Sequence, residues 1–255
     1  MTRWRVIVSD PADGAWNMAV DRSILAAHAA GDAPPTLRLY RFAPPTVSLG
    51  RFQRAGDVDV RYCVEHGVDV CRRPTGGRGV LHDDEVTYSI VAGVRDGVPR
   101  GVRESYRYLS AALAGAYQAL GVQAALTARD RGVAGAACYL HATSADLSLG
   151  AAKLSGSAQV WERDSCLQHG SFVVSRDLER ESRVFMLDEE ASRALGRSTA
   201  TIAQAIGRRP DDEEIRRALR GAVESLLGVT TFVGALSEAE RVFALEHREE
   251  HLLGT

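Results

Sequence analysis

Residues 72–89, RRPTGGRGVLHDDEVTYS, bring together side chains and main chain that can bind an anion or a carbonyl group. Arg72, Arg73, Arg78 and His82 surround a Gly-Gly pair and one further glycine. Glycine allows a ligand to approach the main chain closely, and exposed N–H groups there can bind a carbonyl oxygen or an anion. A glycine-rich turn with solvated arginines is the simpler interpretation, but it does not explain three guanidinium groups at one bend.

This glycine-rich segment does not have the pattern of a nucleotide-binding loop. The P-loop sequence G-x-x-x-x-G-K-[ST] is absent, and a dinucleotide-binding fingerprint requires G-x-G-x-x-G at the start of a helix. Here the glycines connect two predicted strands, so no helix N-terminus follows to receive a pyrophosphate.

The predicted elements around the glycine-rich segment indicate an α+β fold. Strands are predicted over residues 4–8, 36–42, 47–50, 68–73, 85–92 and 230–233, with several short ones within 122–174. Helices are predicted over residues 15–30, 57–67 with Asp57 as N-cap, 102–120, 211–227 and 237–250. Strands that follow one another as hairpins favour a mixed, largely antiparallel central sheet flanked by helices. One catalytic domain over residues 1–255 is expected, with a core of 1–185 and a helical part at 186–255.

The composition is that of an ordinary globular protein. The chain has 255 residues, 45% hydrophobic and 25% charged, with a formal net charge of −2. This balance favours neither nucleic acid nor an anionic membrane as a partner. The N-terminal residues have no long apolar core, so no secretory signal is expected. The sequence has no apolar run of about 18 residues and no C-x-x-C pair among its four cysteines. A cytoplasmic monomer without a metal site is expected.

Four segments in order resemble the lipoate–protein ligase and octanoyltransferase superfamily. They are WNMAVDRSIL at 16–25, PTLRLYRFAPPTVSLGRFQ at 35–53, the glycine-rich segment at 72–90, and AAKLSGSAQVWERDSCLQHGSFVV at 151–174. The resemblance implies the catalytic-domain fold of biotinyl and lipoyl protein ligases. Ligases of the superfamily typically have a third glycine where this chain has Arg78. The segments TGGR and HDDEVTYS are more similar to those of the cysteine-dependent octanoyltransferases.

The same resemblance implies two catalytic residues. Cys138 lies where those octanoyltransferases have their nucleophile, and Lys153 lies where they have an invariant-type lysine. Without the resemblance, a cysteine in AAC is more typical of core packing and a lysine of a solvated surface. The segment YLHATSADL after the cysteine departs from the usual aromatic-rich sequence, which leaves the acyl pocket undefined.

The expected chemistry is thioester exchange followed by aminolysis. A free thiol has a pKa of about 8.5, and a neighbouring ammonium, for which Lys153 is the candidate, favours the thiolate. Exchange of one thioester for another is nearly balanced and amide formation is downhill, so no ATP, metal or other cofactor is expected. Lys153 and main-chain N–H groups of 76–79 or 155–157 are candidates for an oxyanion site. The expected substrate-binding residues are Arg73, Thr75, Gly76, Gly77, Arg78, Gly79, His82, Ser155, Gly156, Ser157, Gln159, His169 and Gly170.

The other cysteines and the histidines are weaker candidates for a catalytic role. Core packing is expected for Cys63 and Cys71, and Cys166 is a minor alternative nucleophile. His169 is expected to be a structural hydrogen-bond partner, whereas His82 is either a proton carrier or structural.

The expected partners are proteins that present a group on an arm. The donor is expected to be acyl carrier protein, and the acceptor a lipoyl domain or the H-type protein of glycine cleavage. Arginines that could steer an acidic carrier to the site are Arg72, Arg73, Arg78, Arg100, Arg103 and Arg107, although the last three also suit a solvated helix face. Alternatives are an amidotransferase between lipoyl-bearing proteins, an ATP-dependent lipoate ligase and a non-catalytic binder of lipoyl domains.

Overall fold

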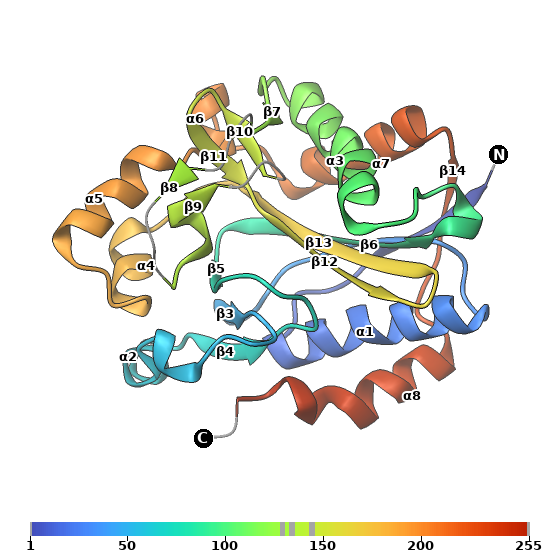
Figure 1. Cartoon of the computed structure of the whole chain (residues 1–255), viewed down its shortest axis with the longest axis horizontal. Coiled ribbons are helices and arrows are strands. Elements are labelled where there is room, and N and C mark those ends of the chain that lie inside the picture. The colour runs from blue at the N-terminus through green and yellow to red at the C-terminus, as the bar shows by residue number, and fades with distance from the viewer. Residues whose placement is uncertain (1, 128–130, 133–135, 143–145, 254–255) are drawn as a thin grey trace.

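A six-stranded sheet forms the centre of the molecule (Figure 1). The computed structural model describes residues 2–127, 131–132, 136–142 and 146–253. The strand order is β12-β13-β6-β2-β1-β14. The bounds are β12 Ser157–Glu162, β13 Ser165–Val173, β6 Glu85–Gly93, β2 Thr36–Tyr40, β1 Arg3–Val8 and β14 Thr230–Val233.

The sheet is mixed and mostly antiparallel, as the sequence predicts. Neighbours from β12 to β2 run antiparallel, whereas β2, β1 and β14 are parallel. β14 belongs to the predominantly helical part beyond residue 185, yet it completes the edge of the central sheet. All nine residues of β6 are buried, which is the pattern of a strand covered on both faces.

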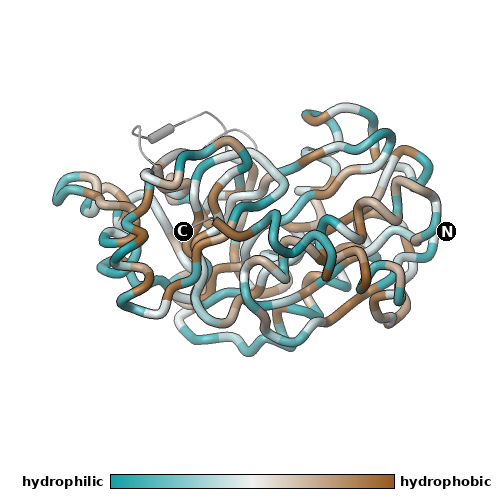
Figure 2. Tube along the Cα trace, turned by 90° about the horizontal axis from the view of Figure 1, so that it is seen from below, coloured by the Kyte–Doolittle hydropathy of each residue, from teal (hydrophilic) through white to brown (hydrophobic). Residues whose placement is uncertain are grey.

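Helices cover both faces of the sheet. α3 (Val102–Ala119) and α7 (Asp212–Leu227) lie on one face, and α1 (Gly14–Ala30) and α8 (Glu238–His247) lie on the other (Figure 1). The core beneath α3 includes Tyr117 stacked on Phe172, with 4.3 Å between ring centroids. Figure 2 shows hydrophilic residues gathered at the periphery of the trace. No helix in the described part of the chain is long and apolar enough to span a membrane.

Helix ends follow local capping chemistry. The Asp13 carboxylate accepts a hydrogen bond from the Trp16 N–H at the start of α1, and Gly31 ends that helix with a φ of 94°. The prediction for α2 is wrong at its start: the helix spans Val60–Glu65 and its N-cap is Asp59, not Asp57. Asp57 instead ends the 3₁₀ turn Ala55–Asp57. Both aspartates satisfy the N-cap preference, but only Asp59 accepts from a helix N–H, that of Tyr62.

Smaller elements pack beside the central sheet and carry the glycine-rich segment. β3 (Thr46–Leu49) pairs with β4 (Asp69–Arg72) and with β5 (Val80–His82). The glycines therefore lie between two strands, but the second is β5, a short strand that was not predicted, and not the predicted strand 85–92. β11 (Ala152–Ser155), β10 (Leu147–Leu149) and β7 (Ala125–Leu126) form a second small sheet, and β8 (Arg131–Gly132) pairs with β9 (His141–Ala142). The remaining helices are α4 (Leu178–Val184), α5 (Glu189–Ser198) and α6 (Ile202–Ile206).

Candidate active site

Cys138 begins the short 3₁₀ helix Cys138–Leu140 beside the glycine-rich segment. Its N–H donates to the carbonyl of Gly79 at 2.8 Å, and the Gly79 N–H donates to the carbonyl of Ala136 at 3.0 Å. A side chain at Gly79 would place its Cβ 2.6 Å from the Phe185 ring. Because glycine alone fits there, the glycine-rich segment can pair directly with the segment that carries the cysteine.

Lys153, in β11, brings its ammonium to the Cys138 thiol. Its Nζ lies 3.5 Å from the Cys138 sulfur and 3.2 Å from the Cys138 carbonyl oxygen, and it forms a 2.9 Å ion pair with Asp146. The lysine is only 1% exposed. Burial opposes its charge, but Cys138 and Asp146 favour that charge more strongly, so its pKa lies above the ordinary value. A permanent cation therefore faces the sulfur, where it can stabilise negative charge.

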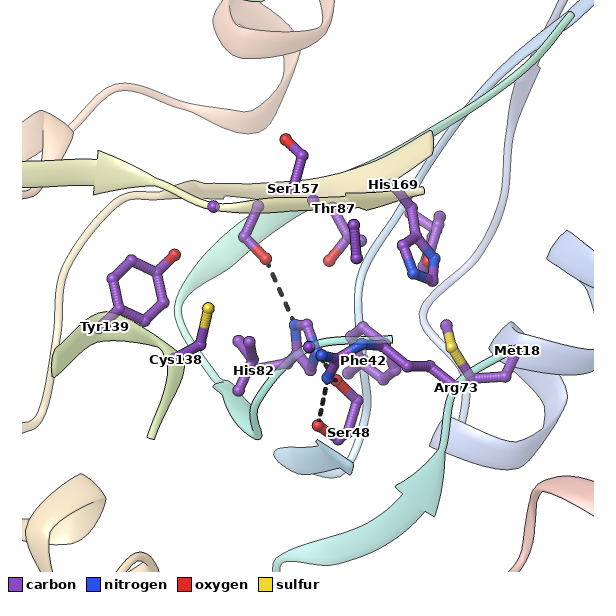
Figure 3. Close-up of a pocket in the computed structure, with 17 residues that line it drawn as sticks. Met18, Phe42, Ser48, Arg73, His82, Thr87, Cys138, Tyr139, Ser157 and His169 are labelled. Atoms are coloured by element: carbon purple, nitrogen blue, oxygen red, sulfur yellow. Dashed lines mark hydrogen bonds between the residues drawn. The ribbon is translucent and has the colours of Figure 1, made fainter. Parts of the chain in front are cut away.

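A cavity of about 520 Å³, counted with its opening to solvent, extends from Cys138. Figure 3 shows Cys138 and Tyr139 at one side of this cavity and Met18 at the opposite side. Its apolar wall suits an acyl chain bound to the sulfur. The lining comes from α1, β2, β3, β5, β6, β12, β13, the 3₁₀ helix Cys138–Leu140 and the connecting loops: Met18, Tyr40, Phe42, Ser48, Arg73, Gly77, Val80, His82, Thr87, Cys138, Tyr139, Gly156, Ser157, Ala158, His169, Gly170 and Ser171.

Arg73 lines the cavity, but its hydrogen bonds hold the glycine-rich segment. The guanidinium donates to the carbonyls of Ser48, Gly76 and Arg78 at 2.7–2.8 Å. It is 5% exposed, and burial lowers its pKa below the ordinary arginine value. Arg73 was predicted to bind substrate, and its described contacts give it the additional role of a clamp on the main chain.

The histidines are fixed by buried partners at the cavity wall. His82 Nδ1 lies 2.6 Å from Glu85, its Nε2 lies 2.8 Å from Ser48, and its ring stacks on Phe42. His169 Nε2 lies 2.7 Å from the Thr75 hydroxyl and its Nδ1 lies 3.1 Å from Asp21. The structural role expected for His169 agrees with these contacts, and His82 has equally well-defined partners.

The remaining predicted substrate-binding residues divide into two groups. Gly77, Gly156, Ser157 and Gly170 line the cavity beside the histidines. Ser155 donates instead to the Ser171 carbonyl, and Gln159 accepts from Ser105 and Trp161. Residues predicted to bind substrate that lie outside the lining are Thr75, Gly76, Arg78, Gly79, Ser155 and Gln159.

Sequence reasoning missed the apolar end of the cavity and the partner of Lys153. Met18, Tyr40 and Phe42 lie in the segments that carry the resemblance, but only the fold shows that they meet. Asp146 is 4% exposed, and the only signal for it was an acid placed directly before an apolar strand. Part of the segment after the cysteine, residues 143–145, lies outside the described residues.

The other cysteines are poor nucleophiles. Burial raises the pKa of Cys63 to about 11 and those of Cys71 and Cys166 to about 12. The predicted packing role of Cys63 and Cys71 is confirmed, since both are buried. Cys166 is buried in β13 and does not line the cavity, which removes it as an alternative nucleophile.

Glu85 links the stability of this site to pH. Burial alone would raise the pKa of Glu85. The charge of His82 and hydrogen bonds from His82, Ser171 and Thr87 have the opposite and larger effect, so the pKa lies below its ordinary value of 4.5. The unfolded chain therefore binds protons more readily than the folded chain, and this stabilisation is lost as pH falls from about 4.5 through the lower folded pKa.

We expect Glu85→Gln to destabilise the protein at pH 7 and to approach wild-type stability as pH falls below about 4.5. Urea unfolding at pH 7, 4.5 and 3.5 measures the difference between the two proteins. Glu65→Gln, at an exposed position of α2, is the control and should show no such convergence. A constant difference between wild type and Glu85→Gln at all three values would contradict the assignment.

A half-buried cysteine lies beside a buried ammonium at the end of an apolar cavity, an arrangement that suits acyl transfer through a thioester. Two solved structures have the same fold. A bipartite lipoate protein ligase from Thermoplasma acidophilum, described with its E2 lipoyl domain, aligns with a TM-score of 0.83 at 22% identity, over 98% of this chain and 93% of that one. A lipoate-protein ligase A bound with ATP aligns at 0.82 and 23% identity, over 97% and 95% of the two chains.

The chain belongs to the lipoyl protein ligase A/B catalytic domain family, whose model matches residues 13–224. Curated relatives agree over nearly the whole chain. The octanoyltransferase LipM of Symbiobacterium thermophilum is 39% identical over 94% of this chain and 92% of its own. That of Kyrpidia tusciae is 36% identical over 99% and 97%. The resemblance in the sequence analysis is confirmed, and so is the fold class.

Proposed function

We propose that the chain is an octanoyltransferase of protein lipoylation that works through a thioester on Cys138. Its curated relatives are named octanoyltransferases and cover most of the chain at 31–39% identity. The observation that carries the thioester mechanism is the buried Lys153 ammonium 3.5 Å from the Cys138 sulfur. The acceptor is a lipoyl-domain protein, and acyl carrier protein is the proposed donor.

In the first step the Cys138 thiolate attacks the carbonyl of the donor thioester. A bond forms between the cysteine sulfur and the acyl carbon, the bond to the donor sulfur breaks, and the donor leaves as a thiol after taking up a proton. The Lys153 cation stabilises the attacking sulfur. Main-chain N–H groups near Gly77 and Gly156, both in the cavity lining, are the proposed donors to the tetrahedral oxyanion.

In the second step the acceptor lysine attacks the acyl-Cys138 thioester as a neutral amine. The amide bond forms, the bond to sulfur breaks, and the proton lost by the amine balances the charge on the released thiolate. Lys153 lies within reach of the sulfur in both steps and is held in place by Asp146. Neither step consumes a nucleotide or requires a metal or other cofactor.

The direct test is octanoyl transfer to a purified lipoyl domain. Octanoyl-acyl carrier protein should modify the domain without ATP, whereas free lipoate with ATP should not. Octanoylated glycine-cleavage H-type protein in place of the carrier protein tests transfer between lipoyl-bearing proteins. Modification that requires ATP and free lipoate would contradict the proposed function.

Met18 closes the cavity opposite Cys138 and is predicted to limit acyl-chain length (Figure 3). We expect Met18→Ala to raise the kcat/KM ratio of decanoyl to octanoyl donor by about 10-fold or more, because one or two methylene groups in an apolar pocket change rates by about 10–200-fold. Met18→Phe is expected to shift preference toward hexanoyl donor. An unchanged preference in both variants would place the end of the acyl chain elsewhere.

A further inference from the structure

The loop that follows β3 presents an exposed aromatic residue between two exposed arginines. Phe52 is 86% exposed, and Arg51 and Arg54 on either side of it are also exposed. The Arg51 guanidinium lies 5.5 Å from the centre of the Phe52 ring. One exposed phenylalanine is ordinary by itself, so the significance of Phe52 depends on how this loop is held and on which part of the site it contacts.

Hydrogen bonds hold this loop in a defined position. Arg72 Nη1 donates to the carbonyls of Gly50, Arg51 and Gln53 at 2.8–3.1 Å. The Arg51 N–H donates to the Thr75 carbonyl at 2.8 Å. Because these bonds fix the main chain, the Phe52 side chain projects from an ordered support, and less entropy is lost when a partner covers it.

The same loop is joined to the catalytic cysteine segment. Gln53 Nε2 donates to the Ala136 carbonyl at 3.1 Å, two residues before Cys138. A Cβ on Gly50 would lie 1.9 Å from the Gly77 carbonyl oxygen, so the loop and the glycine-rich segment touch through their main chains. A protein bound to Phe52 would therefore lie beside the segment that carries Cys138.

A groove runs from this loop between α1 and β12. Arg22, Arg51 and Arg72 line it together with the apolar surfaces of Leu25 and Trp161. Two acids, Glu162 and Glu250, also face it, and Glu250 is ion-paired with Arg22. Arg73 lines both this groove and the acyl cavity, so the two adjoin.

We propose that residues 51–54 dock the acidic protein that delivers the octanoyl thioester, with its phosphate-bearing arm in the arginine-lined groove. Phe52 supplies an apolar anchor, and Arg51 and Arg54 supply charges complementary to an acidic surface. The chain as a whole carries a net charge of −2, so attraction of an acidic partner must come from such a local patch. The inference rests on the proposed function and names the surface that serves it.

The groove distinguishes the donor from the acceptor. A carrier-protein thioester is attached through an arm that includes a phosphate, and guanidinium groups bind phosphate well. A lysine side chain that accepts the acyl group has no phosphate and makes no use of an exposed guanidinium such as that of Arg51.

The test compares two donors for acylation of Cys138, measured by intact mass at early times. One donor is octanoyl-acyl carrier protein, and the other is the octanoyl thioester of N-acetylcysteamine, which has neither a protein body nor a phosphate. Phe52→Ala and the double variant Arg51→Glu with Arg54→Glu are expected to slow acylation by the carrier protein by about 10–100-fold. Acylation by the small thioester should stay within about twofold of wild type, because the docking surface does not touch the reacting atoms.

Matched control variants lie on α8, away from the site. Leu245 is 60% exposed and Arg241 is exposed, so Leu245→Ala and Arg241→Glu remove the same kinds of group. Both should leave acylation by either donor unchanged. In the double arginine variant, the salt dependence of the carrier-protein rate should also flatten.

Each other outcome overturns the proposal. Equal slowing with both donors would make the loop part of the chemical site, and no slowing with either would show that the surface is unused. Normal acylation followed by slow transfer to the lipoyl domain would assign the loop to the acceptor. A wild-type protein acylated by neither donor would overturn the proposed function itself, and the docking surface with it.

Discussion

Replacement of Lys153 by alanine is expected to slow acylation of Cys138 by about 100- to 1,000-fold, the cost of removing one preorganised electrostatic group from an active site. The ammonium lies 3.5 Å from the sulfur in a site where Lys153 is 1% exposed, so water cannot readily replace it. The measurement is the rate of octanoyl adduct formation on Cys138 at saturating donor. An unchanged rate would mean that Lys153 neither activates the thiol nor stabilises the oxyanion.

Loss of Lys153 also removes the ion pair that it forms with the buried carboxylate of Asp146. The double variant Lys153→Ala with Asp146→Asn removes that charge and separates a folding defect from a catalytic one. We expect it to regain stability to urea while acylation stays slow. Asp146→Asn alone should slow acylation less than Lys153→Ala, because it leaves the ammonium in place and loosens only its position.

Asp21 is expected to have the largest effect on stability. Its carboxylate is fully buried and accepts hydrogen bonds from Arg38, Tyr40 and Ser89, and His169 lies 3.1 Å from it. Burial alone would raise the pKa of Asp21. The hydrogen bond with His169 and the charge of Arg38 outweigh burial and hold the pKa below its ordinary value, so the group is an anion in the folded protein. It connects α1 to β2, β6 and β13 beneath the cavity.

Asp21→Ala should therefore lower the free energy of unfolding by about 3–5 kcal/mol, the usual cost of leaving a buried charge, here that of Arg38, without its partner. Urea unfolding at pH 7 measures the change. The control is Asp10→Ala at an exposed position, which should change stability by less than about 0.5 kcal/mol. A loss below about 1 kcal/mol in Asp21→Ala would mean that Arg38 keeps its charge satisfied through Asn17 and Ser9 alone.

Local signals in the sequence predicted much of the fold. β14 occupies the predicted residues 230–233, and α7 starts after the capping aspartate Asp211, because strand pattern and helix capping depend on neighbouring residues. The predicted N-cap of α2 was wrong because Asp57 and Asp59 have the same local preference for that position. Only Asp59 accepts the hydrogen bond from the Tyr62 N–H, a contact that residue type alone does not specify.

The site was harder to predict because its contacts join distant segments. The resemblance placed Cys138 and Lys153, and the fold brings them to 3.5 Å. The clamp of Arg73 on Ser48 and the closure of the cavity by Met18 depend on tertiary packing, which residue type and spacing do not specify. The resemblance therefore predicted that Cys138 and Lys153 act together, whereas the walls of the cavity beside them could not be predicted.

The most direct test of the mechanism is the mass of the protein after incubation with octanoyl-acyl carrier protein in the absence of ATP. The mechanism predicts one octanoyl adduct that hydroxylamine removes and that does not form in Cys138→Ala. An adduct that persists in Cys138→Ala, or octanoyl transfer to a lipoyl domain by that variant at the wild-type rate, would contradict the thioester on Cys138.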